Sequence, residues 1–172
     1  LDHRIGLGPW HPDTKPTALP TVTLECYPCA RTRVSPMYPG RTLVFPLVSR
    51  ELADHLGADL ERHRERCPRT SELLRSLPGI VEGGFSRLDP GTHIYPHAEA
   101  ADSAHVRCHL GIVIPAGAAI RIDGTIHVWK PGACLVFDGH RLHEAANEGA
   151  EPRTILLCDY DPNSIADLEV TR

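Results

Sequence analysis

Short runs of alternating apolar and polar residues, separated by turn residues, fill the chain from residue 80 onward. A period of two over four to eight residues is typical of half-buried strands. Asp123-Gly124 lies between two such runs and is a two-residue hairpin signal, and Pro131-Gly132 marks another turn. The pattern predicts strands over residues 83–88, 93–96, 105–114, 119–122, 125–129, 133–137 and 153–159. Seven short strands with little helix among them favour an antiparallel jelly-roll barrel, whose mouth commonly holds a ligand.

The first half of the chain has a different pattern. Residues 42–48 are strand-like, although Pro46 makes this run an edge strand or a strand end. Apolar residues at helical spacing predict a helix over residues 51–66. A second helix is expected over residues 70–76, with Thr70 as its N-cap.

Residues 1–40 contain seven prolines and no sustained period, which predicts an extended N-terminal arm with one short strand at residues 21–24. Residues 41–172 are then one domain, since a chain of 172 residues buries a sufficient core without disulfides. The expected fold class is mainly β: a double-stranded β-helix, or jelly-roll and cupin-like, core with a few flanking helices.

Composition narrows the classes of function. The formal net charge is −4 and no stripe of lysine and arginine is present, which argues against a nucleic-acid partner. No apolar run approaches the roughly 20 residues that span a bilayer, and no signal-peptide pattern is seen, so we expect no membrane partner and a cytoplasmic location. Six cysteines in a chain of this length do not make a disulfide scaffold. A small molecule or peptide is the expected substrate.

Two histidines and an arginine carry the chemical signal of the sequence. His97 and His143 each lie in a short polar break between strand-like runs, and Arg153 follows ten residues after His143. Neutral imidazoles from two strands of a barrel form half of a non-haem iron site, and an arginine on a neighbouring strand can hold a carboxylate co-substrate beside the metal. This arrangement favours an oxygenase over a hydrolase.

The run over residues 105–114 carries two more polar candidates. Its even-numbered residues are all apolar, whereas Arg107 and His109 share the other face with Gly111. Periodicity alone leaves open which face points into the barrel. Arg107 therefore has two interpretations, as a site residue or as the partner of an ion pair between strands.

Three segments carry a resemblance to a known family: residues 85–97, residues 107–115 and residues 137–144. In these segments the chain resembles the aspartyl/asparaginyl β-hydroxylases, which are iron(II)- and 2-oxoglutarate-dependent oxygenases with a double-stranded β-helix core. The resemblance extends from about Cys67 to Pro162, and residues 1–40 lie outside it. Three motifs in the same order and at similar spacing make it specific.

The resemblance implies a role for each matched position. It implies that His97 and His143 bind Fe(II), and that Ser86 and Arg153 hold the distal carboxylate of 2-oxoglutarate. It also implies that Arg107 and His109 lie near the metal-binding end of this co-substrate. The two-pronged guanidinium of Arg153 suits a carboxylate in a way that a lysine would not.

One position departs from part of the family. Some members have glycine two residues after the first histidine, where this chain has Glu99. A glutamate at this spacing can reach the same metal and complete a set of two histidines and one carboxylate. It can equally turn to solvent, and the sequence leaves both readings open.

The expected activity is that of a dioxygenase that uses Fe(II), 2-oxoglutarate and O2 to hydroxylate an unactivated C–H bond. The β-carbon of an Asp- or Asn-like amino acid, free, carrier-bound or in a small peptide of a natural-product biosynthetic pathway, is the favoured substrate. One alternative is an oxygenase of the same fold that performs desaturation, epoxidation or cyclisation on a small molecule. Another is a cupin-like metal- or ligand-binding module without redox turnover.

Overall fold

The computed structural model describes residues 32–33, 40–50, 53–99 and 106–165 of the chain. Within these residues it has ten strands and three helices. The expected strand at residues 21–24 and nearly all of the expected arm over residues 1–40 lie outside the described residues.

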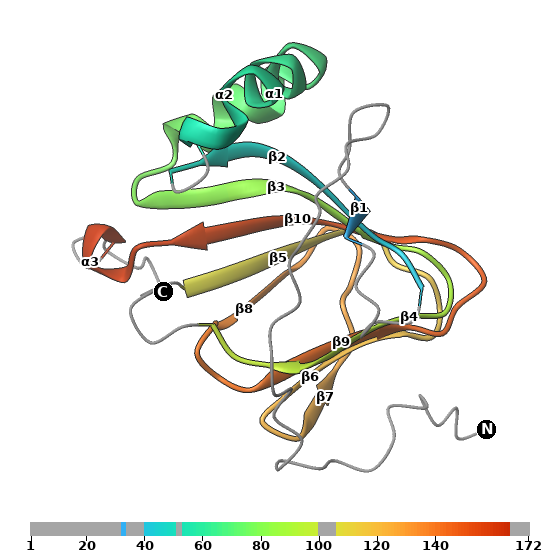
Figure 1. Ribbon diagram of the computed structural model, residues 1–172. Helices are drawn as coiled ribbons and strands as arrows, with labels where there is room; N and C mark the ends of the chain where they lie inside the picture. The colour runs from blue at the N-terminus through green and yellow to red at the C-terminus, as the bar shows by residue number, and fades with distance from the viewer. Residues whose placement is uncertain (1–31, 34–39, 51–52, 100–105, 166–172) are drawn as a thin grey trace.

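The strands carry the labels of Figure 1. Their bounds are β1 Thr32–Arg33, β2 Thr42–Ser49, β3 Ile80–Leu88, β4 Thr92–His97, β5 Val106–Val113, β6 Ala118–Ile122, β7 Thr125–His127, β8 Cys134–Asp138, β9 His143–Asn147 and β10 Arg153–Tyr160. The helices are α1 Ala53–Arg66, α2 Pro68–Ser76 and α3 Pro162–Ile165. Every strand expected within the described residues is present, with ends that differ by a few residues.

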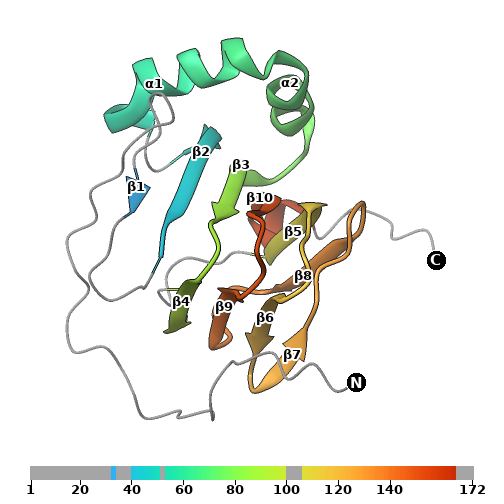
Figure 2. The same cartoon turned by 90° about the vertical axis from the view of Figure 1, so that its right-hand side faces the viewer.

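The strands form two antiparallel sheets that face each other (Figures 1 and 2). The larger sheet has the order β1-β2-β3-β10-β5-β8, and the smaller has the order β4-β9-β6-β7. The chain passes repeatedly between them: β3 is followed by β4 in the other sheet, β5 by β6, β7 by β8, and β9 by β10. This winding confirms the expected double-stranded β-helix with a few flanking helices.

The main core lies between the two sheets and takes residues from both. Its buried members are Leu88, Ala118, Ile120, Ile122, Trp129, Phe137, Ala145 and Ile155, and Ile94, Leu135 and Leu157 pack against them. In β10, Ile155 and Leu157 belong to this inner core, whereas Leu156 and Cys158 belong to a second cluster on the other side of the sheet. The alternation fixes the inner face of β10 as Arg153, Ile155, Leu157 and Asp159.

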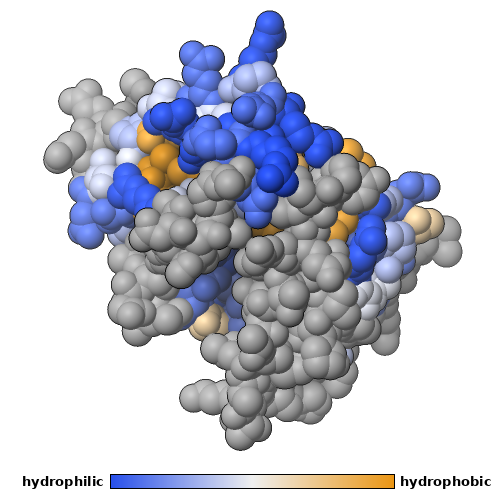
Figure 3. Space-filling view, turned by 45° about the horizontal axis from the view of Figure 1, so that its top comes forward, coloured by the Kyte–Doolittle hydropathy of each residue, from blue (hydrophilic) through white to orange (hydrophobic). Residues whose placement is uncertain are grey.

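Helices α1 and α2 cover the outer face of β2 and β3 (Figure 2). Leu74 of α2 is fully buried there in a cluster with Leu47 and Ile80. The surface over this helical layer is largely hydrophilic (Figure 3), so the helices complete an amphipathic outer layer. No described helix has both the length and the apolar character needed to cross a membrane.

Three local expectations are corrected. Helix α2 begins at Pro68 after Cys67, which makes no side-chain cap, so Thr70 lies inside the helix; proline is well suited to the first turn because the amide it lacks has no partner there. For Pro46 only the strand-end alternative is wrong: it lies at a register shift within β2. Since β1 pairs with β2 only at Thr42 and Leu43, the one described neighbour of β2 at Pro46 is β3, as for an edge strand. His143 opens a strand, β9, that the sequence pattern did not indicate.

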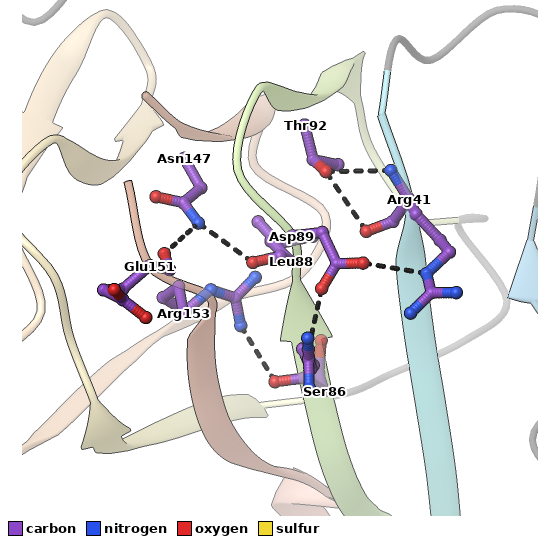
Figure 4. Close-up of polar contacts among 9 residues, drawn as sticks. Arg41, Ser86, Leu88, Asp89, Thr92, Asn147, Glu151 and Arg153 are labelled. Atoms are coloured by element: carbon purple, nitrogen blue, oxygen red, sulfur yellow. Dashed lines mark hydrogen bonds and ion pairs between the residues drawn. The ribbon is translucent and has the colours of Figure 1, made fainter. Parts of the chain in front are cut away.

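Asn147 ties together the two corners at which the chain changes sheets (Figure 4). Its side-chain amide donates to the carbonyls of Leu88 and Glu151, both at 2.9 Å, and it has no exposed surface. Leu88 ends β3, and Glu151 lies in the turn between β9 and β10. Since Arg153 opens β10 two residues later, this amide fixes the start of the strand that carries the arginine.

Candidate metal centre and anion site

His97, Glu99 and His143 form a group that could hold a metal ion. One possible ligand atom from each residue lies within 4.8 Å of the other two. The rings of His97 and His143 have their centroids 4.3 Å apart. The structure therefore brings together the three residues that the sequence suggested as metal ligands, from β4, the residues just after it, and β9. Two imidazoles and a carboxylate are the donor set of non-haem Fe(II) oxygenases.

A β-bulge in β4 puts His97 opposite His143. Pairing between β4 and β9 runs regularly from Thr92 to Ile94, and the register then shifts by one residue before His97 pairs with His143. Ile94 packs into the inner core, so strict alternation would turn His97, three residues on, to the outside. The extra residue of the bulge returns it to the side of His143.

Backbone carbonyls fix the orientation of both rings. Nδ1 of His97 lies 2.8 Å from the carbonyl oxygen of Tyr95, and Nδ1 of His143 lies 2.7 Å from that of Arg141. A carbonyl only accepts hydrogen bonds, so each neutral ring carries its proton on Nδ1. The lone pair of each ring is therefore on Nε2, as a metal ligand requires.

Electrostatics keep His143 in the form that binds metal. Burial, followed by the neighbouring His97, lowers the pKa of His143 to about 4. Burial alone would raise the pKa of Glu99, but the charge and the hydrogen bond of Arg107 oppose it and leave this pKa below its usual value. At neutral pH the group thus holds a neutral imidazole at His143 and an ionised carboxylate at Glu99.

Glu144 joins the two histidine-bearing strands from the other face of the smaller sheet. Its Oε2 lies 2.8 Å from Nε2 of His93 in β4, and its Oε1 accepts from Nη1 of Arg121 in β6 at 2.8 Å. The side chains of Glu144 and Arg121 are 5% and 7% exposed. One buried carboxylate therefore links β4, β9 and β6 directly beside His143.

Arg153 is a buried cation without a carboxylate. It is 2% exposed, its Nη1 donates to the backbone carbonyl of Ser86 at 3.3 Å (Figure 4), and its guanidinium carbon lies 4.7 Å from the ring centroid of Trp129. Its Nε has no hydrogen-bond partner, and no aspartate or glutamate of the described residues forms an ion pair with it. Burial lowers the pKa of Arg153 to about 9. Such a site suits a bound anion, because an uncompensated buried charge is costly.

His109 offers a second buried donor beside the same tryptophan. Nε1 of Trp129 donates to Nδ1 of His109 at 3.3 Å, so a neutral ring carries its proton on Nε2, and that atom is buried without a partner. Burial first, and then Arg153, Arg107 and His143, hold the pKa of His109 well below its usual value. His109 and Arg153 thus both have a donor atom that no described residue satisfies.

The structure settles which way β5 faces. His109 packs against Trp129 and Phe137 of the inner core, so Arg107 and His109 point into the barrel. A Cβ on Gly111, the next residue on that face, would lie 2.3 Å from the carbonyl oxygen of Lys130. Glycine there lets the chain beside Trp129 cross close over β5.

Arg107 lies in the ion-pair network that was its alternative interpretation. Its Nε and Nη2 donate to the two carboxylate oxygens of Asp159 at 2.8 and 2.7 Å, and its Nη1 donates to Glu99. Ser86 faces the interior next to Arg153 and is 7% exposed. Its role toward a co-substrate stays a prediction, as do those of Arg107, His109 and Arg153.

Sequence reasoning missed three polar residues of this region. Trp129 was not among the candidate site residues, yet both His109 and Arg153 contact it. Asp159 had a usable signal, because it shares the alternation of Arg153 along one strand and so had to face the interior. Glu144 had none, since the strand that carries it was not indicated by the pattern.

Comparison with known proteins places this site in a family. The family model described as aspartyl/asparaginyl beta-hydroxylase matches residues 44–162, which include every residue of the metal group and of the anion site. The chain belongs to this family. The family named from the sequence resemblance is thereby confirmed.

Individual relatives match the same region. The chain is 34% identical over 137 residues to aspartate beta-hydroxylase domain-containing protein 2 of Mus musculus, covering 74% of this chain and 38% of that protein. It is 32% identical over 107 residues to the ornithine lipid ester-linked acyl 2-hydroxylase of Rhizobium tropici, covering 60% of this chain and 38% of that protein. The chain therefore matches well under half the length of these relatives. A solved structure of a predicted oxalate decarboxylase from Thermotoga maritima is similar with a TM-score of 0.48 and 13% identity, covering 72% of this chain and 84% of that one.

Removal of the Glu144 carboxylate tests the link between the metal-binding strands. Glu144→Ala takes the carboxylate from the buried Arg121, so we expect the free energy of unfolding to fall by about 3 kcal/mol. Glu151→Ala is the matched control, because the Glu151 side chain is exposed and only its backbone carbonyl is used by Asn147. Urea unfolding of the three proteins measures the difference, and a Glu144→Ala protein as stable as the control would contradict the link.

The buried neutral His109 predicts a loss of stability in acid. The pKa of His109 in the folded protein lies below the value near 6.5 in the unfolded chain. As the pH falls below 6.5, His109 therefore binds a proton in the unfolded chain and not in the folded protein. The stabilisation is complete above pH 6.5 and is lost as the pH falls below it. His109→Gln keeps an acceptor for Trp129 but cannot ionise, so between pH 7 and pH 5 its unfolding free energy should fall by up to about 2 kcal/mol less than that of the parent. Urea unfolding at the two pH values measures this difference. If the parent and His109→Gln lose the same unfolding free energy, His109 is charged in the folded protein at pH 5.

Proposed function

We propose that this protein is an Fe(II)- and 2-oxoglutarate-dependent oxygenase that hydroxylates an unactivated C–H bond. The observation that carries the proposal is the pairing of two incomplete sites inside one barrel. His97, Glu99 and His143 supply a metal-binding donor set, and Arg153 with His109 supplies unsatisfied donors suited to a dianion that reaches toward that metal. A keto acid that chelates iron at one end and carries a carboxylate at the other fits both needs.

The donor set fits Fe(II) by its chemistry. Imidazole nitrogen and carboxylate oxygen suit this ion, and two histidines with one carboxylate are a donor set that non-haem Fe(II) oxygenases use. Bound there, Fe(II) with 2-oxoglutarate and O2 supplies the oxidation: one oxygen atom enters the C–H bond and the other enters succinate as CO2 is lost. The two imidazoles would hold the metal through Nε2, because their Nδ1 protons are used by backbone carbonyls.

The protein's own contribution is orientation and the exclusion of water. Arg153 would bind the distal carboxylate of 2-oxoglutarate, with Trp129 stacked against the guanidinium to hold its plane. His109 would donate from Nε2 to an oxygen of the same molecule. Ser86 of β3 lies beside Arg153, which donates to its backbone carbonyl. On the inner face of β10, Ile155 and Leu157 of the core lie between Arg153 and Asp159 and would keep water away from the bound co-substrate.

For the substrate we propose a small molecule or peptide with an Asp- or Asn-like residue hydroxylated at its β-carbon. The description of the family supports this choice. One relative is named as a hydroxylase of an ester-linked acyl chain, which makes such a chain the informative second substrate to test. A metal-binding module without redox turnover is less well supported, because it gives no reason for a buried arginine that lacks a carboxylate.

Anaerobic reconstitution with Fe(II) and 2-oxoglutarate, followed by O2, tests the activity. The substrate panel holds free Asp and Asn, short peptides containing them, and an ester-linked acyl lipid. We expect succinate to form in step with a product heavier by one oxygen atom, measured by mass spectrometry. His97→Ala and His143→Ala should each lower the rate by at least about 100-fold, because each removes a metal ligand.

The control for this experiment is His127→Ala, which changes a histidine of β7 outside the metal group. It should leave turnover within about twofold of the parent. Turnover that survives in both His97→Ala and His143→Ala would refute the assignment of the metal centre. Binding of a metal without any consumption of 2-oxoglutarate across the panel would favour the non-redox alternative.

Replacement of Arg153 tests the anion site separately from the metal. Arg153→Lys keeps a positive charge but loses the two-pronged donor, so the KM for 2-oxoglutarate should rise by about 10-fold or more with metal affinity unchanged. In thermal unfolding without iron, 2-oxoglutarate should raise the Tm of the parent and not that of the variant. Arg62→Lys, on α1 where the exposed Arg62 pairs with Asp59, is the control. An unchanged KM in Arg153→Lys would show that the co-substrate binds elsewhere.

A further inference from the structure

The two interior arginines of the barrel differ in their charge balance. Arg153 has no carboxylate partner among the described residues, whereas Arg107 has two: Asp159 and Glu99. The charge of Arg107 is therefore already neutralised by carboxylates of the protein.

Asp159 fixes the guanidinium in one orientation. It pairs directly opposite Arg107 in the register of β10 and β5. Its two oxygens accept from Nε and Nη2 in a two-pronged arrangement, and its side chain is 1% exposed. This geometry leaves Nη1 pointing away from Asp159, and it is Nη1 that donates to Oε1 of Glu99.

Glu99 needs such a restraint to act as a ligand. Its side chain is 31% exposed, and it follows the end of β4, where its amide donates to the carbonyl of Gly139 at 3.1 Å. A glutamate has one more rotatable bond than an aspartate, so more side-chain freedom is lost when it holds a metal. Arg107 binds Oε1 of this carboxylate, and the group still has a carboxylate oxygen within 4.8 Å of the nitrogens of His97 and His143.

The charges around Arg107 also leave Glu99 able to bind a cation. Asp159 and Arg107 together are neutral, so the negative charge of Glu99 stays available to a cation. Without the charge of Asp159, Arg107 would be free to turn both of its terminal nitrogens to Glu99 and compete with the metal for it. The buried aspartate thus acts on the metal centre through two other side chains.

We propose that Asp159 and Arg107 are positioning residues that present Glu99 as the third protein ligand of the metal. This inference rests on the proposed function, since it concerns the same metal centre. It gives Arg107 a role toward Glu99 in addition to the role near the metal-binding end of 2-oxoglutarate that the family resemblance implies. Asp159 becomes part of the centre although it contacts neither metal nor co-substrate.

Direct metal titration tests the proposal without turnover. Co(II) is added to the metal-free protein under anaerobic conditions, and its visible absorption reports both affinity and coordination. We expect Glu99→Gln and Asp159→Asn each to weaken Co(II) binding by about 10- to 100-fold. Asp123→Asn, which removes the same charge from the exposed pair with Arg141, should leave the affinity unchanged.

The double variant separates positioning from a general loss of structure. If Asp159 acts through Glu99, then Asp159→Asn should add little to the loss already caused by Glu99→Gln. Independent losses that multiply in the double variant would overturn the proposal, and so would Co(II) affinity unchanged in Asp159→Asn. Arg107→Lys tests the same link at Arg107, and it replaces Asp159→Asn if that variant does not fold.

The same titrations distinguish this proposal from the function on which it rests. If the parent protein does not bind Co(II), or if His97→Ala and His143→Ala bind it as well as the parent, the metal centre itself is refuted. If those two variants lose Co(II) and Glu99→Gln does not, the centre stands and the positioning role of Asp159 fails. If Arg107→Lys raises the KM for 2-oxoglutarate and leaves Co(II) affinity unchanged, Arg107 belongs to the co-substrate site.

Discussion

The register of β4 against β9 is the constraint on which the site depends. Ile94 packs inward and lies three residues before His97, so an uninterrupted strand would send these two side chains to opposite faces. The one-residue shift between them brings His97 opposite His143 on the inner face. Glu144 and Asn147 hold this arrangement: the carboxylate links β4 to β9 beside the bulge, and the amide secures the corner where β9 leads to β10. The candidate metal centre thus depends on a local departure from regular pairing that hydrogen bonds from buried side chains maintain.

Much of the fold follows from the sequence, because strands with one buried face must alternate. This alternation gave the strands around Arg107 and Arg153, and the winding between two sheets followed from their number and spacing. It did not give β9, since His143-Glu144-Ala145-Ala146-Asn147 has no β-branched or large apolar residue. That strand is buried all the same, with Glu144 satisfied by Arg121 and His93. Such cross-strand pairing is a property of the assembled sheet and leaves no mark in one strand's pattern.

The candidate site could be predicted in part for a similar reason. His97, His143 and Arg153 stand out through their motifs and spacing, and the structure places the two histidines together. The direction of Arg107 and His109 could not be read from β5, because an apolar face is needed on both sides of a sheet that packs between helices and a core. The bulge before His97 was equally hidden: its extra residue is counted only against the partner strand. The question left open for Glu99 was likewise one of contact, and Arg107 provides that contact.

Polar residues on an inner face are informative because each must be satisfied by something. The inner positions of β5 and β10 carry Arg107, His109, Arg153 and Asp159 in place of apolar residues. Arg107 and Asp159 satisfy each other across the two strands, with Glu99 as the additional acceptor. His109 and Arg153 do not, because each keeps a buried donor without a partner. The interior thus has one end where Arg107 and Asp159 neutralise each other beside the Glu99 carboxylate, and a cationic end at Arg153. A barrel built only for stability would gain by replacing the second pair with apolar side chains, so their presence supports the proposal that an anion binds there.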